Sequence, residues 1–187
     1  SSNCYYGLFQ IETGMGKSTV LGVKPDNFDE LAACVGIGRP GSYKFIDDFI
    51  KYKQTGEYSS IYPEIDEILK RTGNIILFQE QISEICNKIY KIDLTSADEV
   101  RAAIGKKLPE KMAKWEPILF EKGAENNIPE EVTNLFWSIC KDSASYLFNA
   151  NHCYAYTSLT AITIYLKAKY PKEFFLALLK MTKHEQD

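Results

Sequence analysis

Positively charged side chains gather in one short stretch of the sequence. Arg101, Lys106 and Lys107 lie close together, and Lys111 and Lys114 follow at intervals near one helical turn. An arginine can bind a phosphate group through two parallel hydrogen bonds, whereas a lysine acts as a point charge. Composition alone favours a solvated basic face, with a phosphate-binding site as the alternative.

A second polar group lies in the turn Phe148–His152, which reads Phe-Asn-Ala-Asn-His. An amide and an imidazole at the start of a helix can contact a base or a phosphate, and helix N-termini attract anions. Two other interpretations stay open. The turn can simply cap a helix around a partly buried His152, or His152 and Cys153 can form a nucleophilic pair, for which no orienting third group is identifiable.

Residues 13–19 look like a phosphate-binding loop but do not match its pattern. They read Thr-Gly-Met-Gly-Lys-Ser-Thr. The P-loop of nucleotide hydrolases requires a glycine five positions before the second glycine, and this sequence has Ile11 there. The strand and helix alternation of such enzymes is also missing. We therefore interpret the segment as a glycine-containing turn before a helix.

Cysteine and histidine are too sparse for a disulfide framework or a metal centre. The chain has five cysteines and two histidines, and no cysteines are spaced as a CxxC pair. This pattern indicates reduced, mostly buried thiols, as in a cytoplasmic protein. The cysteines are Cys4, Cys34, Cys86, Cys140 and Cys153.

The overall composition is typical of a folded, water-soluble chain. The 187 residues are 45% apolar and 13% aromatic, which suffices for a hydrophobic core. No apolar run reaches the roughly 18 residues of a membrane helix, and no export signal is recognisable, so we expect a cytoplasmic location without membrane contact. The net charge of −3, from 22 basic and 25 acidic residues, argues against a nucleic-acid binder.

Helices must position the residues above, since apolar residues recur at helical spacing throughout the chain. Residues 75–78 have the composition of a strand, but the apolar stripe continues to Ile89, so we expect a buried turn that leads into a helix. The helix near residues 152–170 is rich in weak helix formers, so burial must support it. The expected helices cover about residues 28–35, 43–50, 63–69, 78–89, 96–104, 109–122, 132–140, 152–170 and 171 onward.

The predicted architecture is mainly α, with eight or nine short helices and little or no sheet. Asp26 or Asn27 is expected to cap the first helix, and Thr95 or Ser96 a later one. A domain division is expected near residues 23–26, where a glycine-rich opening gives way to regular helices. One continuous unit fits the pattern equally well.

Proline and glycine are expected to shape the later helices. The helix that begins at Pro109 should kink at Pro117 and be interrupted at Gly123. The last helix should begin at Pro171. Its core face is expected to consist of Phe174, Phe175, Leu178 and Leu179.

The segment Gly7–Met15 reads Gly-Leu-Phe-Gln-Ile-Glu-Thr-Gly-Met. It resembles the pattern GVFQxESxGM at the palm-to-fingers junction of the alpha subunit of bacterial DNA polymerase III, the C-family replicative polymerase. Further blocks in the same order extend the resemblance over nearly the whole chain. They include Lys24–Asp26, Arg39–Gly41, Phe78–Gln81, Val100–Lys107, Phe148–His152 and Tyr165–Ala168.

The resemblance implies a multi-helix fingers domain over residues 24–187, after a palm-to-fingers junction segment over residues 1–23. Fingers of this family hold the incoming deoxynucleotide and the templating base against the palm. The palm's catalytic aspartates, which bind two magnesium ions, precede the matching region. The chain is therefore expected to carry no catalytic residue, metal ligand or cofactor and to be inactive alone, with magnesium in the parent polymerase.

The same resemblance assigns the basic stretch to the triphosphate. Arg101, Lys106 and Lys107 match the family pattern LRRAMGKK, so they are the expected nucleotide-binding residues. Ala102 stands where the family has its second arginine. Other partners implied by the resemblance are the primed DNA template, the palm and thumb domains, and a sliding clamp bound through other regions.

Asn149 and His152 match the family pattern FNKSH and are further expected nucleotide contacts, although Ala150 and Asn151 replace its lysine and serine. The resemblance also offers candidate contacts to template or primer, namely Arg39 in the RPG turn and Gln79 and Gln81 in a segment that matches YQEQ. For the glutamines the leading interpretation is structural, because polar residues that open a buried helix usually bind nearby backbone groups.

Three functions are therefore compared. The leading hypothesis is the fingers region of a replicative DNA polymerase. The alternative, motivated by Ala102 and Ala150, is a degenerate module that binds DNA or protein without nucleotide transfer, and a generic helical interaction domain is the third. Residues 1–100 carry 10 basic and 15 acidic side chains and residues 101–187 carry 12 and 10. The overall acidity predicts weak DNA binding by the chain alone, with a shallow salt dependence.

Overall fold

The computed structural model describes residues 4–12, 14–39, 41–143 and 146–182. These residues form ten α-helices, two short 3₁₀ segments and no strand, which confirms the mainly α fold class. Their one isolated bridge is parallel and joins Phe78 to Phe148. The elements are α1 (Gly14–Val23), α2 (Phe28–Ile37), η1 (Tyr43–Phe45), α3 (Ile46–Thr55), α4 (Pro63–Leu69), η2 (Lys70–Thr72), α5 (Gln79–Lys88), α6 (Leu94–Gly105), α7 (Pro109–Glu125), α8 (Glu130–Ser143), α9 (Ala150–Lys169) and α10 (Pro171–Thr182).

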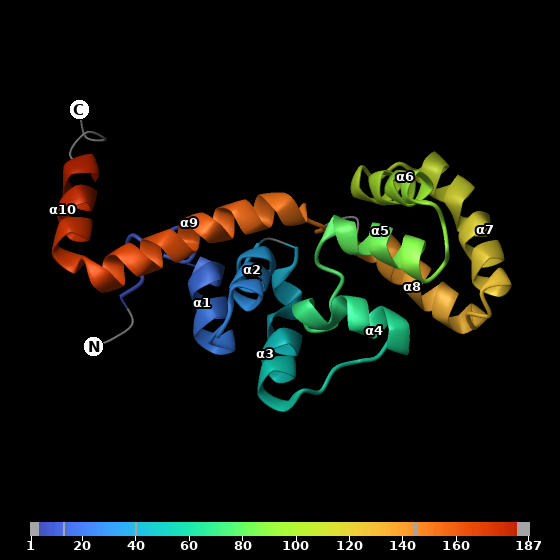
Figure 1. Ribbon diagram of the computed structural model, residues 1–187, viewed down its shortest axis with the longest axis horizontal. Coiled ribbons are helices and arrows are strands. Elements are labelled where there is room, and N and C mark those ends of the chain that lie inside the picture. Colours follow the sequence, from blue (N-terminus) through green and yellow to red (C-terminus); the bar gives the residue numbers. More distant parts are fainter. Residues whose placement is uncertain (1–3, 13, 40, 144–145, 183–187) are drawn as a thin grey trace.

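The helices pack around two hydrophobic cores. Figure 1 shows α5–α8 grouped near the N-terminal end of α9, with α1 and α2 beside α9, α3 on their far side and α10 turned away at the other end of α9. The first core is built mainly by α4–α8 and includes Ile82 and Phe136. The second core is built mainly by α1–α3 and the start of α9, and it includes Phe49 and Cys153.

The segment Ile75–Phe78 connects the two cores. Ile76 packs in the first core, whereas Ile75, Leu77 and Phe78 pack in the second. All four side chains are buried, and α5 begins directly afterwards at Gln79. The expected buried lead into a helix is therefore confirmed, but the expected turn at residues 75–78 is wrong, because Phe78 has an extended backbone and forms the bridge to Phe148.

Short polar side chains cap the helices, although not always at the predicted residue. Asn27 caps α2 as expected, because its side chain accepts a hydrogen bond from the N–H of Glu30 at 2.9 Å. The prediction of Thr95 or Ser96 as the cap of α6 is wrong. Asp93 is the N-cap, and its Oδ1 accepts from the N–H of Ser96 at 3.0 Å.

Two predictions about the later helices are also wrong. Gly123 does not interrupt α7, which continues to Glu125. This glycine is buried, and a Cβ atom there would lie 2.8 Å from Oγ1 of Thr133, so it allows α8 to approach closely. The face of α10 is not core, because Phe174 is only partly buried and Leu179 is 67% exposed. The main neighbours of α10 are α9 and the segment around Gly7, and they cover only part of its apolar face.

The described part of the chain bears on three further expectations. The division near residues 23–26 stays a prediction, and Val23 and Ala32 on its two sides pack into the same core.

The thiols are free and four of the five are buried, as predicted. Burial raises the pKa of Cys34 and Cys86 to about 12. No described helix is long and apolar enough to cross a membrane.

The segment that looks like a P-loop is mostly helix. Lys17 and Ser18 lie within α1, which begins at Gly14. Gly16 is buried, and a Cβ atom there would overlap the carbonyl oxygen of Gln10. The glycine is thus explained by close packing of α1 on the preceding turn.

We predict that Gly16→Ala lowers the free energy of unfolding by about 1–3 kcal/mol, because backbone must move to admit the methyl group. Ser18→Ala changes an exposed side chain on the same helix and should have an effect within about 0.5 kcal/mol. Urea unfolding followed by circular dichroism measures both variants. Equal stability of the two variants would contradict the packing explanation.

Candidate functional site

The N-terminal ends of α5 and α9 lie side by side. The N–H of Gln79 donates to the carbonyl oxygen of Phe148 at 2.9 Å, and the N–H of Phe148 donates to that of Leu77 at 3.3 Å. Both helices therefore begin next to this bridge, α5 at Gln79 and α9 at Ala150. Because helix N-termini carry partial positive charge, two neighbouring ends favour a negative group between them.

The negative group at this place is Glu80, from the first turn of α5. Its Oε1 accepts a hydrogen bond from Nδ2 of Asn149, and its Oε2 accepts one from the N–H of Ala150, both at 2.8 Å. Asn149 also caps α9, because its Oδ1 accepts from the N–H of His152 at 2.9 Å. A carboxylate on one helix thus binds the start of another.

Arg101 reaches the same place from α6. Its Nη1 donates to Oε1 of Gln79 at 2.9 Å, while Nε and Nη2 donate to the two carboxylate oxygens of Asp98 at 2.6 and 3.1 Å. These bonds with Asp98 raise the pKa of Arg101 and hold the pKa of Asp98 below its usual range. The arginine side chain is 24% exposed, so its neighbours fix its orientation while leaving it accessible.

His152 belongs to a row of rings that continues along α9. Its ring centre lies 4.1 Å from that of Tyr156 and 5.2 Å from that of Phe148. The guanidinium carbon of Arg39 lies 3.6 Å from the centre of the Phe148 ring, a cation–π contact. Arg39 and His152 thus contact the same aromatic side chain.

Cys153 does not form a nucleophilic pair with its neighbour. Its Sγ donates to the carbonyl oxygen of Ala32 at 3.2 Å. The residue is fully buried, and this burial raises the pKa of the thiol to about 11. A thiolate nucleophile is therefore disfavoured here.

Gln81 lies inside the protein. Its Oε1 accepts from the N–H groups of Leu77 and Phe78, and its Nε2 donates to Oγ1 of Thr72. All three distances lie between 2.7 and 2.9 Å, and the residue is 0% exposed. The structure therefore gives Gln81 the structural position that was its leading interpretation, with no surface for DNA.

Lys106 and Lys107 lie at the exposed end of α6, directly after Gly105. Gly105 leaves room for the side-chain amide of Gln79. A Cβ atom at position 105 would lie 3.0 Å from Nε2 of Gln79. Neither lysine side chain forms an ion pair or a hydrogen bond with the described residues. Lys107 also borders a separate hollow beside Trp137.

We call Gln79, Glu80, Asp98, Arg101 and Asn149 the junction cluster. Sequence reasoning found its glutamine, its arginine and its asparagine, but missed the two carboxylates as partners. Asp98 was detectable, since a residue three positions before an arginine on a helix lies on the same face. Glu80 gave no such signal, because its partners lie about 70 residues away.

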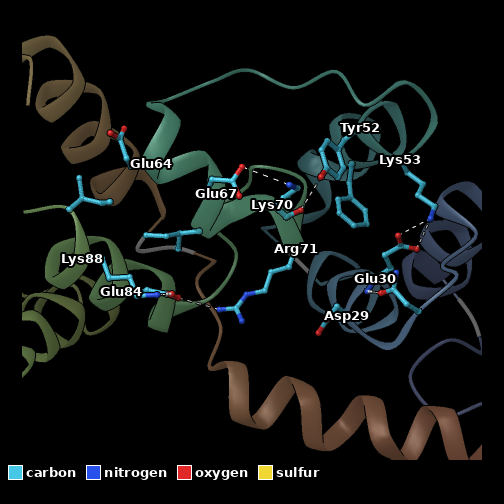
Figure 2. Close-up of a pocket in the computed structure, with 14 residues that line it drawn as sticks. Asp29, Glu30, Tyr52, Lys53, Glu64, Glu67, Lys70, Arg71, Glu84 and Lys88 are labelled. Atoms are coloured by element: carbon cyan, nitrogen blue, oxygen red, sulfur yellow. Dashed lines mark hydrogen bonds and ion pairs between the residues drawn. The ribbon is translucent and has the colours of Figure 1, made fainter.

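A separate hollow lies elsewhere, and no predicted site residue lines it. It has a volume of about 810 Å³ and lies among α2–α5. Figure 2 shows that its cations face acidic partners. Lys53 binds Glu30 at 2.7 Å, and Arg71 and Lys88 bind Glu84 at 3.4 and 2.7 Å. Its cations are paired with carboxylates, as Arg101 is with Asp98, and what distinguishes the junction cluster is its two adjoining helix N-termini.

We predict that Arg101→Ala raises the pKa of Asp98 toward the ordinary value of an aspartate. The carboxylate form loses its hydrogen-bonded cation in this variant, so protonation becomes easier. A pH titration of the Asp98 carboxyl carbon by NMR measures the change. Arg71→Ala removes an arginine that pairs with Glu84 instead and should leave this pKa unchanged. An unaltered Asp98 pKa in Arg101→Ala would contradict the observed pairing.

Comparisons with known proteins agree with the resemblance. The family described as "Bacterial DNA polymerase III alpha subunit finger domain" matches residues 1–127. DNA polymerase III subunit alpha of Aquifex aeolicus is 35% identical over 182 residues, or 96% of this chain. The corresponding values are 35% over 188 residues (97%) for Thermus aquaticus and 34% over 181 residues (92%) for Escherichia coli K12.

The chain spans only 15–16% of the length of these relatives, so the similarity concerns one region of much longer proteins. That region includes the junction cluster, because the family match covers its first four residues and the relatives match almost the whole chain. The family match extends over more than half of the 187 residues. The chain therefore belongs to the finger domains of the bacterial DNA polymerase III alpha subunit.

Proposed function

We propose that the chain works as the fingers of a DNA-directed DNA polymerase and positions a deoxynucleoside triphosphate for transfer. The observation that carries this proposal is the convergence of Arg101, Asn149 and two helix N-termini at the junction cluster. A triphosphate needs positive charge around its oxygens. The helix N-termini supply partial positive charge on backbone N–H groups, and the guanidinium of Arg101 supplies a full positive charge.

Each residue then has a distinct part. Arg101 binds phosphate oxygens, and to do so its guanidinium exchanges Asp98 for the ligand. Lys106 and Lys107 add exposed positive charge at the end of α6. Asn149 and His152 contact the nucleotide from the start of α9, and the exposed ring of His152 can stack or donate a hydrogen bond.

Arg39 is the proposed contact to template or primer. Its guanidinium lies over the ring of Phe148, which also contacts the ring of His152. A phosphate can bind the edge of a guanidinium whose face rests on an aromatic ring. Gln79 is assigned a supporting part, since its amide oxygen binds Arg101. Gln81 is left out of this proposal because it is buried.

The metal chemistry of the reaction is assigned to other parts of a longer polymerase. The described residues contain no group of three or more His, Cys, Asp or Glu side chains that could hold a metal ion. The same proposal includes as partners primed DNA, the palm and thumb domains, and a sliding clamp bound elsewhere. It also includes a cytoplasmic location.

A degenerate module is the competing function, and two residues favour it. Ala102 and Ala150 stand where the resembled family has positively charged side chains. Such a module would keep the helical fold and bind DNA or protein without holding a nucleotide. The two functions differ in whether a polymerase that contains the chain depends on Arg101.

We predict that Arg101→Ala, introduced into the polymerase polypeptide that contains this chain, raises the KM for deoxynucleoside triphosphates roughly ten- to hundredfold. A hydrogen bond to a charged group contributes about 1.5–3 kcal/mol, which corresponds to this range. Primer extension at varied nucleotide concentration measures it. Arg71→Ala, which removes an arginine from the hollow in Figure 2, is the matched control with an unchanged KM.

Two outcomes would contradict this proposal. An equal KM for Arg101→Ala, Arg71→Ala and the unaltered polymerase would remove Arg101 from nucleotide binding. A correctly folded parent protein that binds DNA but extends no primer would favour the degenerate module.

A further inference from the structure

Glu80 is the side chain that joins the two halves of the proposed nucleotide site. Gln79 and Arg101 come from α5 and α6, which build the first core. Asn149 and Ala150 belong to the start of α9, where Phe148, Ala150 and Cys153 pack with the second core. Glu80 lies on α5 and binds both Asn149 and Ala150, so its carboxylate connects the two cores.

Both oxygens of Glu80 are used in this connection. One accepts from a side-chain amide and the other from a backbone N–H that has no partner within its own helix. The carboxylate also lies close enough to raise the pKa of Arg101. Neutral replacements lose part of this set, because an amide offers only one acceptor oxygen.

The position of Asn149 depends on this carboxylate as well as on its own helix. Its Oδ1 is held by the N–H of His152 and its Nδ2 by Glu80, so both ends of the amide are fixed. Without Glu80, the Nδ2 end and the first turn of α9 lose their link to α5. The backbone bonds between residues 77–79 and 148 would remain, so the fold is expected to persist with a looser site.

We propose that Glu80 is a positioning residue for nucleotide binding. It holds Asn149 and His152 at the position relative to Arg101 that the nucleotide requires. This inference rests on the proposed function and adds a residue that it did not assign. A simple competitor makes the opposite prediction: a carboxylate that merely occupied the anion position of the α9 N-terminus would weaken nucleotide binding, and its removal would strengthen it.

The test compares Glu80→Ala, Glu80→Gln and Glu99→Gln in the polymerase that contains this chain. Glu99 is an exposed carboxylate on α6, so its variant controls for the loss of one negative charge from this part of the chain. Primer extension gives KM and kcat for the nucleotide, and a separate assay gives the affinity for primed DNA. Thermal unfolding reports whether each variant keeps its fold.

We expect Glu80→Ala to raise the nucleotide KM roughly ten- to hundredfold, since small displacements of positioning groups have effects of this size. Glu80→Gln should rescue part of the loss, because it keeps one acceptor oxygen. DNA affinity and the unfolding temperature of Glu80→Gln should match those of Glu99→Gln. In an Asn149→Ala background, Glu80→Ala should add much less, because one of its partners is already absent.

Three results would overturn the inference: an unchanged KM in Glu80→Ala, a lower KM in that variant, or fully additive effects with Asn149→Ala. Should Glu80→Ala fail to fold, Glu80→Gln alone decides, and a KM equal to that of Glu99→Gln refutes the inference. A failure of this inference differs from a failure of the proposed function. In the first case Arg101→Ala still raises the KM, and in the second it does not.

Discussion

The N-termini of α5 and α9 are held together by hydrogen bonds between residues about 70 positions apart. Backbone bonds between residues 77–79 and 148 set the distance, and Glu80 binds the first turn of α9. The other groups of the site depend on this contact. Arg101 is oriented by Gln79 at the start of α5, and Asn149 and His152 occupy the start of α9.

The fold provides this contact by sharing one extended segment between two cores. Residues 75–78 are buried on both sides, since Ile76 packs in one core and its neighbours pack in the other. Successive side chains of an extended backbone point to opposite faces, so neighbouring residues can pack in different cores. The weak helix formers of α9 are fully buried only as far as Thr160, since Cys153, Thr157 and Thr160 are 0% exposed.

The sequence was most informative where local chemistry decides the structure. The cap at Asn27 and the helix beginnings at Pro63, Pro109 and Pro171 follow from side chains that act on their own turn. Gly123 was misinterpreted because its role is to admit a neighbouring helix rather than to end its own. Local patterns could not predict the carboxylate of Glu80, whose partners are distant in sequence, and the resemblance supplied Arg101 and Asn149 without their geometry.

The central claim is that groups from both cores form one anion site at the junction cluster. NMR titration of the ¹⁵N-labelled chain with dATP tests it most directly. The account predicts that signals of Gln79, Arg101, Asn149 and His152 shift together along a single binding curve. Shifts confined to Lys106 and Lys107, or to the residues of the hollow in Figure 2, with the cluster unchanged, would contradict it.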